Sequence, residues 1–133
     1  MTKENLTTSA IQLLKDLIEI PSFSSEEHLT AARIEQWFTD YKVPFQRSQN
    51  NIWATNADFD ASKPTLLLNS HHDTVKPNES YTLNPFCPSV KEGKLSGLGS
   101  NDAGASLVCL ISTFCCFYEA QLPFNLVMAA TGE

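Results

Sequence analysis

The stretch LLLNSHHD at residues 66–73 decides the fold and the chemistry of this chain, together with GLGSNDAG at residues 97–104. In the first stretch, a run of apolar residues typical of a buried strand leads without a turn into two histidines and an aspartate. An open α/β sheet presents its functional groups at the carboxyl ends of its strands. The pattern therefore predicts a functional site at the end of this strand.

Side chains alternate between the two faces of a strand, so His71 and Asp73 should point one way and His72 the other. Histidine is the commonest nitrogen ligand for zinc, and it usually donates its second N–H to a carboxylate or a carbonyl group. We therefore predict that His71 binds a metal ion and that Asp73 orients its ring. The plain alternative is that these are polar residues where a strand meets solvent, which is the commoner explanation of an isolated His-x-Asp motif.

The second stretch does not match two familiar motifs. Asp102 occupies the third glycine position of a dinucleotide fingerprint, where a carboxylate would repel a pyrophosphate. The residues around Ser100 do not form the Gly-x-Ser-x-Gly motif of a hydrolase nucleophile. We predict instead that a glycine-rich segment delivers Asp102 to the start of a helix over residues 103–118. Taken alone, Asp102 would be a helix N-cap, whereas beside His71 its carboxylate can bridge two metal ions.

The remaining patterns predict an α/β domain. Apolar residues recur with helical spacing over residues 5–20 and again after Ser24 and Glu27, which match a capping box. Strand-forming stretches separated by turn residues predict two hairpins and two further strands, at residues 44–55, 88–96, 65–69 and 124–130. The last strand leads to Glu133. A lone glutamate there is a surface residue, but the strand ends of an open sheet converge on one crevice and favour its joining the other acids.

Composition limits the class of partner. The chain has 133 residues, 42% hydrophobic and 18% charged, as expected of one globular domain. Its net charge of −6, with no cluster of Lys or Arg, argues against nucleic acid or an anionic membrane surface and favours a small molecule. Without an apolar run of about 20 residues or a signal-like start, we expect a cytoplasmic protein. We expect its four cysteines to be reduced and mostly buried, with no metal role.

Three motifs in order, SHHDTV, NPF and SNDAG, followed by an apolar strand that ends in an acid, resemble a known family. It is the di-zinc metallopeptidase family that includes acetylornithine deacetylase, succinyl-diaminopimelate desuccinylase, aminoacylases and carboxypeptidases. The wording LNSHHDTVKPN is most similar to acetylornithine deacetylases. The resemblance implies an α/β, three-layer catalytic domain, with a mostly parallel mixed central sheet flanked by helices.

The resemblance also implies roles for single residues. His71 would ligate one metal, Asp73 would orient His71, and Asp102 would bridge two zinc ions, with cobalt or manganese also acceptable. Glu133 would be either the general base or the acidic residue that precedes it. Two metals about 3.5–4 Å apart polarise an amide carbonyl and activate a shared water, whose proton a glutamate passes to the leaving amine.

The resemblance further implies that residues 1–133 are the N-terminal part of a longer catalytic domain, without the dimerisation domain of a homodimeric parent. We expect weak metal binding, no turnover and an exposed apolar sheet edge from this part alone. N-acetyl-L-ornithine, in arginine biosynthesis, leads among expected substrates, with succinylated amino acids and dipeptides behind it. A non-catalytic binding module and a hydrolase without metal are the alternatives.

Overall fold

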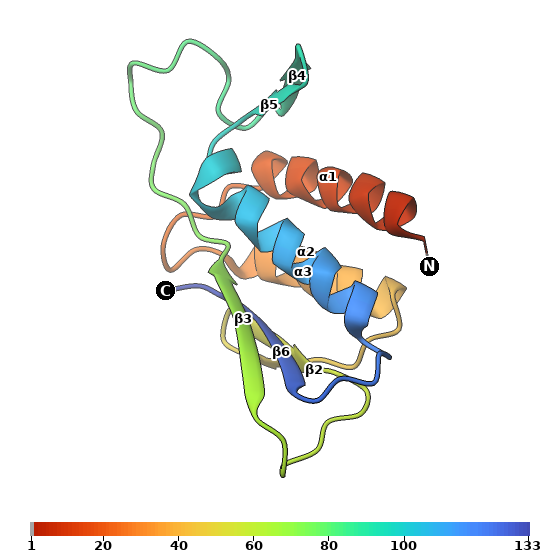
Figure 1. The fold of residues 1–133 in the computed structure, drawn as a ribbon. Coiled ribbons are helices and arrows are strands. Elements are labelled where there is room, and N and C mark those ends of the chain that lie inside the picture. The colour runs from red at the N-terminus through yellow and green to blue at the C-terminus, as the bar shows by residue number, and fades with distance from the viewer. Residues whose placement is uncertain (1) are drawn as a thin grey trace.

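The computed structural model describes residues 2–133, which form three helices, a four-stranded sheet and a small separate hairpin (Figure 1). In chain order the elements are α1 (Lys3–Glu19), α2 (His28–Asp40), β1 (Gln46–Ser48), β2 (Asn51–Thr55), β3 (Thr65–His71), β4 (Ser89–Lys91), β5 (Lys94–Ser96), the irregular turn η1 (Ser100–Gly104), α3 (Ala105–Phe117) and β6 (Asn125–Thr131). The predicted helices, strands and hairpins are therefore all present, with small shifts at their ends.

Strand β6 lies inside the main sheet, whose order is β1-β2-β6-β3. It pairs in parallel with β3 over seven residue pairs and antiparallel with β2. Helix α3 forms the crossover between the two parallel strands, as a parallel connection requires. The sheet is mixed, as expected, but it is not mostly parallel, because the β1–β2 hairpin adds two antiparallel pairings.

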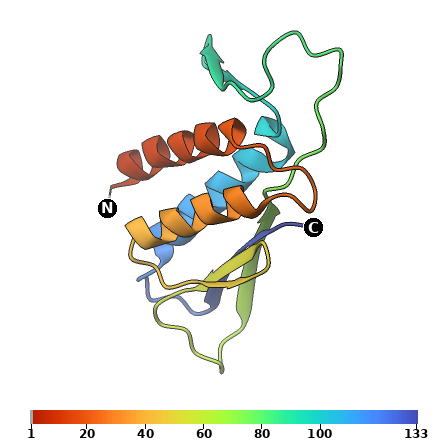
Figure 2. The same ribbon diagram turned by 180° about the vertical axis from the view of Figure 1, so that it is seen from behind.

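Helices α2 and α3 pack on one face of the sheet, and α1 packs on these two helices on the side away from the strands (Figures 1 and 2). Alternate residues of β6 point into this layer and are buried, whereas their neighbours are only half-buried. Helices α2 and α3 touch through Phe38 and Phe114, whose rings meet edge to face with their centroids 6.3 Å apart, and both rings are fully buried. Within residues 2–133 all three helices thus lie on the same side of the sheet, and the helices expected on the second face are not among these residues.

Strand β3 lies at the edge of the sheet, which corrects the prediction of a buried strand. It has a paired neighbour only in β6 among the described residues, and the side chains of Leu66 and Leu67 are 49% and 57% exposed. Its apolar sequence is typical of a strand with a neighbour along each edge, but among the described residues β3 pairs along one edge only. The expected exposed apolar edge is therefore confirmed.

Helix α2 does not begin with the predicted capping box. Residue Ser24 lies outside the helix, and its hydroxyl donates to Asp73 Oδ2 at 3.2 Å. Glu27 is the N-cap residue, but its side chain makes no capping hydrogen bond and is buried. Instead of accepting from a helix N–H as a cap would, the Ser24 hydroxyl donates to a carboxylate from a distant part of the chain, and hydrogen bonds to charged groups are the stronger ones. Leu29, the second residue of α2, is exposed.

The segment Ser100–Phe117 is long and apolar enough to cross a membrane by length and composition, which the sequence analysis did not expect. A core helix passes the same test, and α3 has the contacts of one. Its residues Leu107, Ile111 and Phe114 are fully buried in the cluster that also holds α1 and the sheet. All four cysteines are free, as expected, but Cys115 alone is buried, so the expectation that most of them are buried was wrong.

The buried stripe of α1 generates a stability prediction. Leu13 is completely buried, while Ile11, two positions earlier on the same helix, is 47% exposed. We expect Leu13→Ala to lower the free energy of unfolding by about 2–5 kcal/mol, because it leaves a cavity in the core. Ile11→Ala is the matched control and should cost less than about 1 kcal/mol, since surface substitutions have small effects. Urea denaturation of both variants measures the difference, and equal losses would contradict this packing.

Candidate metal site

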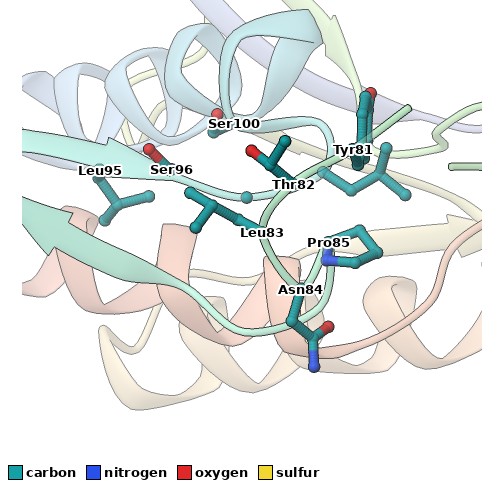
Figure 3. A pocket seen from close by; sticks show the side chains of 10 residues that line it. Tyr81, Thr82, Leu83, Asn84, Pro85, Leu95, Ser96 and Ser100 are labelled. Atoms are coloured by element: carbon teal, nitrogen blue, oxygen red, sulfur yellow. The ribbon is translucent and has the colours of Figure 1, made fainter. Parts of the chain in front are cut away.

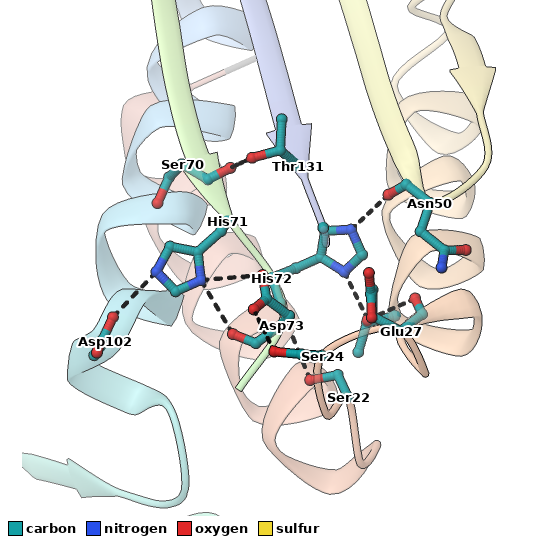
Figure 4. A network of polar contacts seen from close by, with 12 residues as sticks. Ser22, Ser24, Glu27, Asn50, Ser70, His71, His72, Asp73, Asp102 and Thr131 are labelled. Atoms are coloured by element: carbon teal, nitrogen blue, oxygen red, sulfur yellow. Dashed lines mark hydrogen bonds and ion pairs between the residues drawn. The ribbon is translucent and has the colours of Figure 1, made fainter. Parts of the chain in front are cut away.

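His71 is the last residue of β3, and its ring is held from one side by Asp73 (Figure 4). Its Nδ1 lies 3.1 Å from the Asp73 carbonyl oxygen and 3.4 Å from the carboxylate Oδ1. The other carboxylate oxygen accepts the Ser24 hydroxyl, which fixes the aspartate in turn. We assign the ring proton to Nδ1, because both nearby groups of Asp73 are acceptors. This leaves the lone pair of Nε2 free to face the opposite way, as predicted for a metal ligand.

Asp102 faces that free nitrogen. Its Oδ1 lies 3.1 Å from His71 Nε2, and its side chain is 90% exposed. The η1 turn that carries Asp102 follows Gly99, whose φ of 75° lies in the left-handed region that glycine tolerates best. The predicted delivery of an aspartate by a glycine-rich segment to the start of α3 is therefore confirmed.

The two facing atoms fit part of a metal site. Two ligands of a tetrahedral zinc, with bonds of about 2.0–2.2 Å, lie about 3.4 Å apart. The observed 3.1 Å between His71 Nε2 and Asp102 Oδ1 is close to this spacing, and a nitrogen plus a carboxylate oxygen is a donor set that zinc accepts. Residues 2–133 contain no group of three His, Cys, Asp or Glu side chains placed to hold an ion. The described chain thus supplies two donors of a site and not a complete one.

Glu133 does not join this pair in the structure. It is exposed, and no hydrogen bond or ion pair among the described residues links it to His71 or Asp102. Three of the four predicted site residues are therefore brought together, while the role of Glu133 stays a prediction.

His72 points away from His71 into the protein, as the strand alternation predicted, and it is buried there (Figure 4). Its Nε2–H donates to the Asn50 carbonyl oxygen at 2.7 Å, and its Nδ1 lies 2.7 Å from the Thr30 hydroxyl. Its own carbonyl oxygen accepts the Ser22 hydroxyl. The sequence alone assigns His72 no role, although its place between two predicted site residues is a signal. It anchors the strand end against α2 and the β1–β2 turn.

Two neighbouring cavities open at the site. One, of about 370 Å³, is lined by His71, Asp73 and Asp102 together with Tyr81 and the 97–101 segment. The other, of about 320 Å³, lies between residues 81–85 and residues 95–100, and it shares Tyr81 and part of the glycine-rich segment with the first (Figure 3). The lining of the second cavity contains no charged side chain. The long 74–100 segment therefore forms one wall of the site.

The comparisons with known proteins agree with this geometry. A family model described as peptidase family M20/M25/M40 matches residues 67–133, which include the two motifs of the site. The chain belongs to this peptidase family. A curated relative, the succinyl-diaminopimelate desuccinylase of Xylella fastidiosa (strain M12), is 34% identical over 110 residues, which cover 78% of this chain and 28% of that protein. The chain thus spans a little over a quarter of the length of this M20 relative.

Solved structures show the same fold. The di-peptidase Dug1p from Saccharomyces cerevisiae matches 97% of this chain and 33% of its own, with a TM-score of 0.72 and 22% identity. The YXEP protein of Bacillus subtilis, described as a dinuclear metal binding peptidase from the M20 family, matches 98% of this chain and 36% of its own, with a TM-score of 0.70 and 19% identity. The described residues therefore match part of the catalytic domain of M20 enzymes.

The comparisons also correct one expectation. The segment LNSHHDTVKPN indicated acetylornithine deacetylases, but the similar curated proteins include succinyl-diaminopimelate desuccinylases of Xylella fastidiosa and Delftia acidovorans and one described as probable in Staphylococcus aureus. They do not support the specific acetylornithine and arginine-biosynthesis expectation. The shared motifs contain the predicted metal-site residues. Enzymes of one family can share such residues and still act on different substrates, so these motifs do not identify the substrate.

The hold of Asp73 on His71 generates a prediction about metal affinity. Asp73→Asn keeps the shape but removes the charge that makes Nε2 a better donor. We expect zinc to bind about 10–100-fold more weakly, the usual effect of losing such a partner. Zinc titration against a competing chelator measures this loss. Asp58→Asn, at an exposed position, is the matched control and should leave affinity unchanged.

The burial of His72 predicts how stability depends on pH. Loss of hydration lowers the pKa of His72 below its ordinary value, against the opposing effects of the Asn50 carbonyl and of Glu27 and Asp73. Because the folded pKa lies below the unfolded one, this contribution to stability is present above about pH 6.5 and is lost as the pH falls. Urea denaturation between about pH 7 and pH 5 should therefore show a steeper loss for the native protein than for His72→Gln. His28→Gln, at an exposed position, should keep the native slope.

Proposed function

We propose that this chain is the N-terminal part of an M20 metallo-hydrolase that cleaves the amide bond of an N-acyl amino acid or a dipeptide. The observation that carries the proposal is the convergence of His71 Nε2 and Asp102 Oδ1 to 3.1 Å in a chain of this family. Two acceptor atoms of this kind repel one another unless a cation or a proton lies between them. A bound divalent metal ion satisfies both.

Each of the four predicted site residues has a role in this proposal. His71 and Asp102 hold zinc, and Asp73 keeps the ring of His71 in the tautomer that leaves Nε2 free. A bound metal would supply a polarised amide carbonyl and a water of lowered pKa. Glu133, as general base or as the acid before it, follows β6 at the same edge of the sheet as His71, because β3 and β6 are parallel.

The number of metal ions follows from the family. The Bacillus subtilis relative is described as a dinuclear metal binding peptidase, and an exposed Asp102 carboxylate has a second oxygen available for a second ion. The third ligand comes from a part of the protein that these residues do not include. We therefore propose two zinc ions in the whole protein and weak binding of one ion by this part alone.

The curated relatives favour succinylated amino acids over N-acetyl-L-ornithine as the substrate class. The curated relatives are succinyl-diaminopimelate desuccinylases, and the matched solved structures include dipeptidases. A succinyl group ends in a carboxylate that needs a cationic partner. The linings of the two cavities at the site contain neither Lys nor Arg among the described residues. The residues that recognise this carboxylate are therefore expected outside residues 2–133.

An assay of the whole protein that contains this chain tests the proposal. We expect hydrolysis of N-succinyl-L,L-diaminopimelate that a chelator abolishes and added zinc restores, with N-acetyl-L-ornithine and a dipeptide assayed beside it. His71→Ala should lower the rate by at least about 100-fold, because the metal loses its nitrogen ligand. His28→Ala is the matched control and should keep the native rate.

Other results would select the alternatives. Hydrolysis that ignores both chelator and His71→Ala, but stops with a thiol reagent, would identify a hydrolase without metal. Zinc binding without hydrolysis of any amide would identify a binding module.

A further inference from the structure

Glu27 is a buried carboxylate without a visible partner. Its side chain is completely buried, and neither Oε1 nor Oε2 has a hydrogen-bond partner among the described residues. Burying a charged or polar group without compensation is costly, so each such group in a folded protein needs an explanation. Glu27 occupies the N-cap position of α2, but its side chain makes no capping hydrogen bond, and the predicted capping box does not form. Its role must therefore lie in what it packs against.

Glu27 packs against the backbone of Gly132, directly after β6. A Cβ atom built on Gly132 would lie 2.7 Å from Glu27 Cγ and 2.8 Å from Cδ, closer than real Cβ atoms approach. The glutamate side chain thus occupies the space that any larger residue at position 132 would need. The two residues are 105 positions apart in the sequence, yet the Glu27 side chain fills the space that Gly132 leaves by having no side chain.

Other contacts hold the same short segment. The Gly132 N–H donates to Asn51 Oδ1 at 2.9 Å, and the His72 N–H donates to the Thr131 carbonyl oxygen at 3.0 Å. Glu27 packs against Gly132 and lies beside His72 (Figure 4), and its carbonyl oxygen accepts the Thr30 hydroxyl at 3.0 Å. Three separate elements therefore fix the path of the chain at the residue before Glu133.

We propose that Glu27 is a positioning residue, which sets the direction in which the chain leaves β6 and so orients Glu133, which follows Gly132 at the edge of the sheet where β3 ends with His71. The inference rests on the proposed function, in which Glu133 is the general base or the acid before it. Glu27 touches neither substrate nor metal in this arrangement. It acts through the backbone of Gly132, and its shape is what the position requires.

A double-mutant cycle in the whole protein tests this role. Gly132→Ala should lower kcat by about 100-fold, as displacement of a reacting group by about 1 Å does. Glu27→Ala should lower kcat by about tenfold with KM and zinc content unchanged, because the segment is no longer supported. In the double variant, the space vacated by Glu27 accepts the new methyl group. Its kcat should exceed that of Gly132→Ala by about tenfold, a coupling that independent sites do not show.

Two further variants separate positioning from stability. Glu27→Gln keeps the shape of the side chain and should recover kcat to within about threefold of the native value, while Glu26→Ala, at the exposed neighbouring position, is the matched control. A Glu27→Ala enzyme with native kcat and only a lower Tm would overturn the inference. So would strictly additive effects on kcat in the cycle.

The outcomes also distinguish this inference from the proposed function. If the native protein hydrolyses no amide in the presence of zinc, both the proposed function and the positioning role of Glu27 are contradicted. Native hydrolysis without coupling between positions 27 and 132 would remove the positioning role alone. If Gly132→Ala yields no folded protein, the comparison of Glu27→Ala with Glu27→Gln decides: equal kcat values for these two variants would overturn the inference, and the expected difference would support it.

Discussion

The parallel pairing of β3 with β6 is the constraint on which the rest of the structure depends. Its register sets His71 opposite Thr131, so both strands end at the same edge of the sheet. A parallel pair needs a crossover, and the crossover helix α3 must begin near the edge where β3 ends. Asp102 lies in the turn that leads into this helix. The pairing of β3 with β6 therefore brings His71, Asp102 and the end of β6 to the same edge of the sheet, although they lie far apart in the sequence.

Much of this arrangement could be predicted from local sequence patterns. The apolar runs before His71 and before Thr131 identified both parallel strands, and strand alternation placed His71 and His72 on opposite sides. The glycine-rich approach to Asp102 followed from the same kind of argument. These predictions succeeded because each depends on residues that are neighbours in the chain.

Contacts between distant residues could not be predicted in this way. The pattern at Ser24 and Glu27 is a good local capping box, yet Ser24 binds Asp73, which lies 49 residues further on. The burial of Glu27 depends on Gly132, and the exposure of β3 depends on which strands are present beside it. The substrate was beyond reach for a related reason, since residues that bind metal are shared by enzymes that differ in the groups binding the rest of the substrate.

The open edge of β3 has a consequence for handling the protein. Residues 65–70, TLLLNS, contain no charge, no proline and no glycine, and two of the leucines are largely exposed. Short segments of this composition, presented on an unpaired edge, form the dry interfaces between stacked strands that build amyloid fibrils. Covering this edge would therefore do more than complete a sheet: it would keep a segment with the composition of fibril-forming strands away from other copies of the same chain.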